Sequence, residues 1–546
     1  KVGSVTIETD LPPHSLTGSV YLGSPTGAPI AGPPYTIYLD AESVYGVSVR
    51  LQGEVTPNPT TGRLEASFLK NPPLPFSELT LTLRGGPLAP VANPLVCGSA
   101  LTEALFAPYT GEPPALSSTP FSTTGCPSPL PFSLTQGTRS SSAGAAAYTS
   151  YTFELAREDG QQYLSGLSTD LPPGLVGAIP SVALCGEPQA RLGSCSAASL
   201  LGTATVTAGA GAEPFVFSGP VYLTGPYSGA PYGLSVPVRA VAGPFDLGTV
   251  VTRAAVGVDP YSGRVIVTSA LPTIVGGVPL RLRTLGVAVT RSRFLFNPTN
   301  CGVLATETTL TSTLGATQAL STPFQATGCA SLPFKPKLVA STNAKTSRPR
   351  GASLTVKVGY PKGTQANIKS VFVTLPRRLP SRLSTLNQAC AAPVFGANPL
   401  ACPPASRVGS VKVRTPVLPG ELVGPAIFVS HGGAGFPDLD LVLRGDGVTV
   451  ILVGNTNISR GVTTSDFASI PDVPVSSFEV KFPTGKYSAL AAFGNLCAQK
   501  LFMPTTITAQ NGKAIRQRTR IAVSGCHLKH RRSHRRHRGR RPKPSR

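Results

Sequence analysis

The chain alternates apolar and polar residues over many short stretches. Leucine occupies every second position from Leu79 to Leu83, and Leu280 and Leu282 repeat the pattern with an arginine between them. A period of two places apolar side chains on one face of a β-strand and polar side chains on the other. Turn sequences such as PNPTTG and DPYSG separate these runs, and no 3.6-residue period is sustained. The pattern therefore predicts an all-β protein made of antiparallel strands.

Longer stretches of the sequence repeat. The segment GSVTIETDLPPHSLTGSVYLGSP from Gly3 aligns with GTATVTAGAGAEPFVFSGPVYLTGP from Gly202 and with GSVKVRTPVLPGELVGPAIFVS from Gly409. Each copy ends with one cysteine in NPLVCG, NPTNCG or GNLCAQ and a second in STPFSTTGC, STPFQATGC or RTRIAVSGC. The chain therefore contains three long repeats of about 120 residues each.

A shorter unit lies between the long copies. YLSGLSTDLPPGLVGAIPSVALC, ending at Cys185, aligns with NIKSVFVTLPRRLPSRLSTLNQAC, ending at Cys390. A unit of about 70 residues is marginal as an independent fold, so we expect it to need covalent staples. Because the chain opens directly in a long copy, we also expect a short partner upstream of Lys1.

The repeat order predicts tandem antiparallel β-sandwiches of the immunoglobulin-like kind, with alternating long and short modules. The expected segments are 1–126 (long), 127–201 (short), 202–329 (long), 330–407 (short), 408–526 (long) and a disordered basic tail at 527–546.

Composition narrows the class of protein. The 57 glycines and 56 prolines among 546 residues disfavour long helices, and the 41% hydrophobic content with only 13% charged residues argues against disorder of the chain as a whole. Every apolar run is interrupted, so no segment is predicted to span a bilayer.

The ten cysteines form five pairs in the repeat register. The members of each long-unit pair are 29, 28 and 29 residues apart, and the short-unit pairs are 10 and 12 apart. Metal ligation and free thiols are the alternatives, but each module offers two cysteines, no CxxC and no nearby histidine, whereas zinc sites normally take four ligands. Disulfides, typical of an oxidising compartment outside the cytoplasm, are the favoured interpretation. The predicted bridges are Cys97–Cys126, Cys185–Cys195, Cys301–Cys329, Cys390–Cys402 and Cys497–Cys526.

The formal charge of +23 is concentrated at one end of the chain. Residues 1–330 carry 15 basic and 18 acidic side chains, whereas residues 331–546 carry 33 basic and 7 acidic ones. Residues 331–406, in the second short unit, contribute eleven basic residues, among them Arg377, Arg378 and Arg382, and no acid. The tail adds ten basic residues, four histidines and no acid.

Such a tail is predicted to bind polyanions, because arginines clamp phosphates and carboxylates. Anionic cell-wall polymers or an anionic lipid surface are the expected partners. Specific nucleic-acid recognition is not expected, since no aromatic residue interleaves with the charges. Metal capture by the four tail histidines is the less favoured alternative, and a solvated basic segment is the preferred interpretation. These histidines are His527, His530, His534 and His537. The expected polyanion-binding residues are Lys529, Arg531, Arg532, Arg535, Arg536, Arg538, Arg540, Arg541, Lys543 and Arg546.

The runs DLPPGLVG, GPFDLGTVV, NPTNCG and STPFQATGC resemble a repeat found in large, uncharacterised secreted proteins of soil actinobacteria. The resemblance is strongest from Leu164 to Phe334 and extends, more weakly, to Cys526. It implies an exported or cell-surface repeat protein and supplies no catalytic residue.

The sequence contains no convincing catalytic motif. His14 lies in a turn sequence, and His431 opens HGGAG without the G-x-S-x-G motif that accompanies such a loop in esterases. Asp438 and Asp440 alternate along a predicted strand, unlike a calcium loop. Neither a cofactor nor a metal site is expected, and Asn457 is a glycosylation sequon that would only mark exposure.

We therefore expect a non-enzymatic secreted or cell-surface structural protein: a rod of disulfide-linked β-modules held at the envelope by its basic end. The alternative is an adhesin or carbohydrate-binding protein that uses loops of the long modules. An extracellular enzyme or a nucleic-acid-binding protein is the least favoured class.

Overall fold

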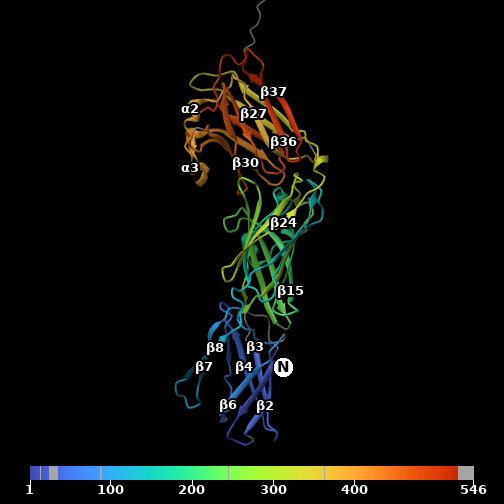
Figure 1. The fold of residues 1–546 in the computed structure, drawn as a ribbon, viewed down its shortest axis with the longest axis vertical. Coiled ribbons are helices and arrows are strands. Elements are labelled where there is room, and N and C mark those ends of the chain that lie inside the picture. Colours follow the sequence, from blue (N-terminus) through green and yellow to red (C-terminus); the bar gives the residue numbers. More distant parts are fainter. Residues whose placement is uncertain are drawn as a thin grey trace, which may run out of the picture.

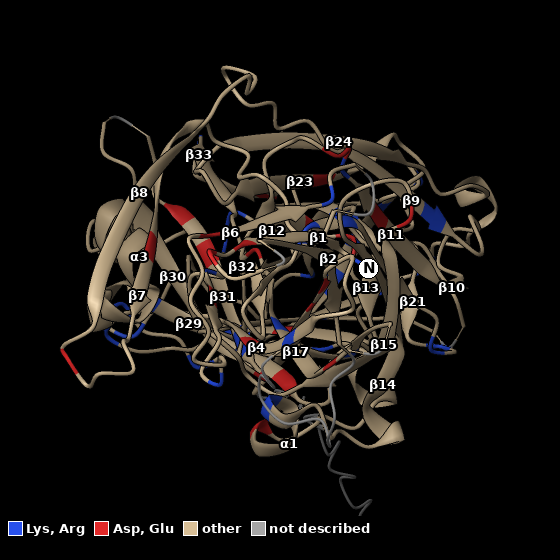
Figure 2. Ribbon diagram, turned by 90° about the horizontal axis from the view of Figure 1, so that it is seen from below, with Lys and Arg blue, Asp and Glu red and all other residues tan. Residues whose placement is uncertain are grey.

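The computed structural model describes residues 1–12, 14–23, 35–86, 89–243, 245–361, 363–433 and 435–526. These residues fold into three β-units stacked end to end along one long axis (Figure 1). Figure 2 looks along that axis, and the units overlap one another in it. We call them the N-terminal unit (1–126), the middle unit (127–329) and the C-terminal unit (330–526). The expectation of an all-β protein with antiparallel sandwich modules is confirmed.

The N-terminal unit contains a six-stranded antiparallel sheet in the order β5-β4-β3-β2-β1-β6 and a separate hairpin, β7-β8. Its strands are β1 Gly3–Glu8, β2 Ser15–Leu22, β3 Tyr35–Glu42, β4 Ser48–Pro57, β5 Leu64–Ser67, β6 Glu78–Leu83, β7 Gly98–Phe106 and β8 Ala115–Thr123. Six buried residues, Val5, Ile7, Leu16, Val20, Leu39 and Ala41, make up its apolar core. All six come from strands β1 to β3, as the alternation predicts.

The middle unit contains a sheet of eleven strands in the order β24-β23-β12-β18-β17-β16-β15-β14-β21-β11-β9, a small sheet β10-β22-β13 and the strand pair β19-β20. Its strands are β9 Thr135–Ser140, β10 Tyr148–Thr149, β11 Tyr151–Ala156, β12 Leu164–Asp170, β13 Val176–Gly177, β14 Leu200–Ala208, β15 Phe215–Thr224, β16 Tyr232–Ala242, β17 Phe245–Val258, β18 Val265–Ala270, β19 Ile274–Val275, β20 Val278–Pro279, β21 Leu282–Val289, β22 Leu295–Phe296, β23 Leu304–Ser312 and β24 Thr317–Phe324. A short helix, α1 (Glu187–Leu192), lies outside the sheet.

The C-terminal unit has a related arrangement, in which the parallel pairing of β25 with β37 joins two groups of strands into one open sheet. The order is β32-β31-β30-β29-β35-β26-β25-β37-β36-β27-β34-β33, and β28 pairs with β30. Its elements are β25 Lys337–Asn343, β26 Leu354–Gly359, β27 Ile368–Thr374, α2 Leu383–Leu386, β28 Cys390–Ala391, α3 Ala392–Ala397, β29 Arg407–Arg414, β30 Glu421–Ser430, β31 Asp438–Gly445, β32 Val448–Leu452, β33 Asn455–Ser459, β34 Val462–Phe467, β35 Ser477–Phe482, β36 Leu501–Ala509 and β37 Ala514–Ser524.

The expected boundary between a short and a long module does not match this topology. Strand β11, from the short segment 127–201, pairs along its length with β21 of the long segment 202–329, and β12 lies between β18 and β23. The C-terminal unit repeats the arrangement, with β26 beside β35 and β27 between β34 and β36. A short and the following long segment therefore form one domain, because neither can cover its own apolar face.

Candidate functional site

All ten cysteines form disulfide bonds, and the pairs are those that the repeat register predicts. The Cα–Cα distances of the five bridges lie between 5.4 and 5.9 Å. The bridges are Cys97–Cys126, Cys185–Cys195, Cys301–Cys329, Cys390–Cys402 and Cys497–Cys526. Disulfides of this density are typical of proteins in oxidising compartments.

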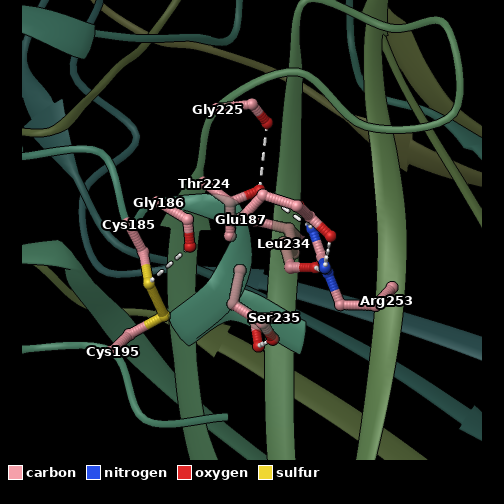
Figure 3. Close-up of polar contacts among 10 residues, drawn as sticks. Cys185, Gly186, Glu187, Cys195, Thr224, Gly225, Leu234, Ser235 and Arg253 are labelled. Atoms are coloured by element: carbon pink, nitrogen blue, oxygen red, sulfur yellow. Dashed lines mark hydrogen bonds and ion pairs between the residues drawn. A yellow bond between two sulfur atoms is a disulfide. The ribbon is translucent and has the colours of Figure 1, made fainter. Parts of the chain in front are cut away.

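The Cys185–Cys195 bridge closes a loop that holds helix α1 against the sheet of the middle unit (Figure 3). The guanidinium of Arg253, on β17, donates to both carboxylate oxygens of Glu187 at 2.9 and 3.0 Å. Its Nε also donates to the carbonyl of Leu234 at 3.1 Å, and the group lies 4.3 Å from the ring centroid of Tyr227. The ion pair lowers the pKa of Glu187. Arg253 thus fastens the short segment to a strand of the long one.

A buried carboxylate joins the middle and C-terminal units. Asp472, in the loop before β35, is 7% exposed and accepts four hydrogen bonds. Its Oδ2 accepts from the main-chain N–H groups of Thr299 (2.7 Å) and Asn300 (2.9 Å), and its Oδ1 accepts from the Thr299 hydroxyl (2.6 Å) and the Asn367 amide (2.8 Å). Burial raises the pKa of Asp472, and these donors oppose the rise.

Main-chain and apolar contacts extend this junction. The N–H of Ile451 donates to the carbonyl of Pro260 at 2.7 Å, and the N–H of Ile179 donates to the carbonyl of Val417 at 3.0 Å. Leu418 and Val450 of the C-terminal unit pack against the apolar cores of both units. Middle and C-terminal cores are therefore continuous across the junction.

A basic surface covers the outer face of the C-terminal unit. In the neighbouring strands β29, β35, β26, β25 and β37, outward-facing positions align across the sheet register. Eight basic residues occupy them: Lys337, Lys357, Lys412, Arg414, Lys481, Arg516, Arg518 and Arg520. We call this set the basic face.

Two acids partly neutralise the basic face. Glu479 pairs with Lys357 at 2.8 Å and with Lys481, while Glu421, on β30, pairs with Lys412 and Arg414. These lysine hydrogen bonds lower the pKa of both glutamates. The other four basic residues have no acidic partner among the described residues, so their charge faces solvent.

The basic face overlaps in part with the basic residues noted in the sequence, since Lys337 and Lys357 belong to the short segment 330–407. Arg382 donates to the carbonyls of Pro349, Gly485 and Lys486, and Arg378 donates to the carbonyl of Phe493, so both brace loops. The ten predicted polyanion-binding residues of the tail lie outside the described residues. The signal that was overlooked is the strand IRQRTRI at 515–521, where arginine occupies every second position.

His431, Asp438 and Asp440 lie close together in the C-terminal unit, whereas the four histidines of the tail lie outside the described residues. His431 Nε2 lies 3.0 Å from Asp438 Oδ2, next to Asp440 on the same strand. Asp440 is 2% exposed, and its burial together with the neighbouring Asp438 raises its pKa to about 7. In the part of the chain that the structure describes, no group of three or more His, Cys, Asp or Glu side chains could hold a metal ion. His14 lies on an exposed turn between β1 and β2.

One cavity runs through the cores of the middle and C-terminal units and has a volume of about 530 Å³. Nearly all its lining side chains are apolar. Among the few polar ones, Tyr232 and Tyr360 have buried hydroxyls with no hydrogen-bond partner among the described residues. Burial raises the pKa of Tyr232 to about 12, so its hydroxyl stays protonated at neutral pH. The cavity offers room for apolar groups rather than an acid–base pair.

Comparisons with known proteins place the chain in no family. No family model matches it, and no curated protein matches it. The solved structures similar to it include the C-terminal domain of the Streptococcus agalactiae AgI/II polypeptide BspA, at 8% identity and a TM-score of 0.19, covering 71% of this chain and 100% of that one. The N-terminal domain of the Streptococcus gordonii adhesin Sgo0707 is 8% identical, with a TM-score of 0.17 and coverage of 93% and 85%. The type II cohesin dyad of ScaA from Acetivibrio cellulolyticus is 11% identical, with a TM-score of 0.16 and coverage of 70% and 95%. TM-scores this low carry no argument about function.

The fold and its bonds define the class: a multi-unit, disulfide-bonded, all-β protein. Within the described residues, no helix is long and apolar enough to cross a membrane.

Proposed function

We propose that this is a non-enzymatic secreted or cell-surface structural protein, a rod whose basic end binds anionic polymers or lipid headgroups of the cell envelope. The stacked units and the five disulfides support the rod. The observation that carries the binding role is the basic face, which lies on the terminal unit of the stack (Figure 1).

The spacing of the basic face suits a repeating anion. Arg516, Arg518 and Arg520 project from one side of β37, and alternate residues on a strand lie about 6.8 Å apart. Lys337 and Lys357 continue the charge on the next two strands. A polymer with regularly spaced phosphates can therefore contact several cations at once, and the attraction adds up along its length.

The test is binding of the full chain to immobilised polyphosphate and to anionic phospholipid vesicles across a salt series. We compare it with the triple variant Arg516→Gln, Arg518→Gln and Arg520→Gln. Because each lost phosphate contact reduces the salt dependence, the variant should bind more weakly and its log–log salt slope should fall by about 2–3. The polymer arm and the vesicle arm separate the two anionic partners.

A matched triple, Arg50→Gln, Arg139→Gln and Arg191→Gln, removes the same charge from the N-terminal and middle units. A further variant lacking residues 527–546 measures the contribution of the tail. If both triples and the tail deletion bind like the unmodified chain, or if binding does not depend on salt, the basic end is not the anchor.

A further inference from the structure

The N-terminal unit lacks strands that its two counterparts possess. In the repeat register, the strands β1 to β6 correspond to β14 to β18 and β21 of the middle unit, and the hairpin β7-β8 corresponds to β23-β24. In the middle unit, β12 lies between β18 and β23 and joins the hairpin to the sheet, while β11 covers the free edge of β21. No described strand does either for the N-terminal unit, in which β5 and β6 are sheet edges and the hairpin stands apart.

Exposed aromatic residues lie on the hairpin β7-β8, at positions that are covered by neighbouring strands in the middle unit. Phe106 aligns with Leu310 through the motif TEALF and TETTL, and Phe121 aligns with Phe324 through STPF. Phe106 and Phe121 are 60% and 48% exposed, whereas Leu310 and Phe324 are 0% and 7% exposed. Equivalent apolar positions are thus buried in the middle unit and exposed in the N-terminal unit.

The short segment provides the missing cover in the middle unit. Leu167 of β12 pairs directly with Leu310, and Tyr151 of β11 lies 6.4 Å from the ring of Phe324. In the C-terminal unit a strand of the short segment again covers the hairpin: β27 lies beside β36, where Met503 and Ile507 are completely buried. Two copies in the chain therefore show what occupies this site when it is filled.

We propose that the N-terminal unit is a docking site for a short repeat unit. One strand of that unit, with the pattern of β12, enters between β5 and β7, and a second, with the pattern of β11, pairs with β6. Main-chain hydrogen bonds along the open edges and burial of Phe106 and Phe121 provide the affinity, as in other cases of strand addition. The short segment 127–201 of the same chain is not available, since its strands are already paired within the middle unit.

The experiment uses the full chain and a synthetic peptide of residues 135–173, which contains β9, β11 and β12 and no cysteine. Fluorescence anisotropy of the labelled peptide measures binding, and hydrogen exchange of the chain locates it. We expect saturable binding and new amide protection in β5, β6 and β7, with no change in β18 or β23. The control peptide carries Phe153→Ser and Leu155→Ser, which keep the main-chain bonds but remove apolar cover, and should bind at least about tenfold more weakly.

Two receptor variants test the site itself. Phe106→Asp and Phe121→Asp alter exposed side chains, so the unliganded chain should keep its stability, but each should weaken peptide binding at least about tenfold. The proposal is overturned if the peptide does not bind, if protection appears only in the middle or C-terminal unit, or if the receptor variants and the control peptide change nothing.

Discussion

The junction between the middle and C-terminal units depends on one acceptor, and Asp472→Ala removes it. The substitution keeps the Cβ atom and deletes both oxygens that accept from Thr299, Asn300 and Asn367. Asn367 can turn toward other partners, but the main-chain N–H groups of Thr299 and Asn300 cannot. Two buried donors are left without an acceptor.

The magnitude follows from those two donors. An unsatisfied buried donor costs about 1–3 kcal/mol, so the pair predicts a loss of about 4 kcal/mol at the junction. That corresponds to an increase of about a thousandfold in local opening. Asp472→Asn is the informative companion: its one oxygen can keep both main-chain bonds, while its NH₂ group donates to the Thr299 hydroxyl and to a flipped Asn367. We therefore expect a cost of about 1 kcal/mol or less for the asparagine variant.

A local probe suits this prediction better than a global melting curve, because unfolding of a multi-unit chain is not two-state. Hydrogen exchange of the segment around Thr299 and Asn300 reports opening of the junction directly. Asp466→Ala, which removes a carboxylate from β34 of the same unit, serves as the control and should leave that exchange unchanged. Protection retained in Asp472→Ala, or lost equally in Asp472→Asn, would refute the reasoning.

Three further outcomes are expected. The raised pKa of Asp440, about 7, favours the neutral acid in the fold, so its contribution to stability is complete below about pH 4 and is lost as pH rises through 7. Asp440→Asn should therefore stabilise the C-terminal unit at pH 8 by up to about 4 kcal/mol but not at pH 4, measured by hydrogen exchange of strands in that unit. Replacing Cys185 and Cys195 with serine should cost about 3 kcal/mol, and alkylation of the unreduced native chain should label no cysteine; a labelled thiol would contradict the pairing. Arg253→Met should loosen helix α1 by about 2–3 kcal/mol, whereas Glu187→Gln, at a side chain 56% exposed, should loosen it much less. Equal losses would show that the ion pair, rather than the contact with the Leu234 carbonyl, holds the helix.

Strand type and disulfide pairing could be predicted from the sequence because both depend on local or periodic signals. The alternation around Leu79 reports which face of β6 is apolar, and the constant spacing of cysteines such as Cys301 and Cys329 recurs in each long copy. Both patterns can be recognised in the sequence without knowing which strands are neighbours in the fold.

The domain boundaries, the Asp472 junction and the basic face could not be predicted, since they depend on contacts between segments that are distant in the sequence. Nothing near Tyr151 in the sequence indicates that β11 pairs with β21, about 130 residues further along the chain. Asp472 lies in an ordinary loop sequence, and only the junction shows that it accepts from Thr299. The basic face likewise combines residues from five strands, of which only the run at 515–521 forms a visible pattern.

The two junctions of the rod differ in how firmly they are held. Between the middle and C-terminal units, the Asp472 contacts and the shared core combine with the Cys301–Cys329 bridge, where Asn511 donates to the carbonyl of Cys329 at 2.8 Å. The junction of the N-terminal and middle units has an edge-to-face contact between Tyr35 and Phe245, with ring centroids 4.9 Å apart, and a close approach of Pro57 to a glycine turn.

That glycine is Gly277, whose φ of +80° and proximity to Pro57 leave no room for a side chain. No hydrogen bond or ion pair joins these two units among the residues that the structure describes. The contacts between described residues at this interface are few and mostly apolar, and an interface of that kind permits relative motion of its domains. We therefore expect bending to concentrate at the N-terminal junction. Such bending would let the unit with open sheet edges turn relative to the basic end, which we propose to be the anchor.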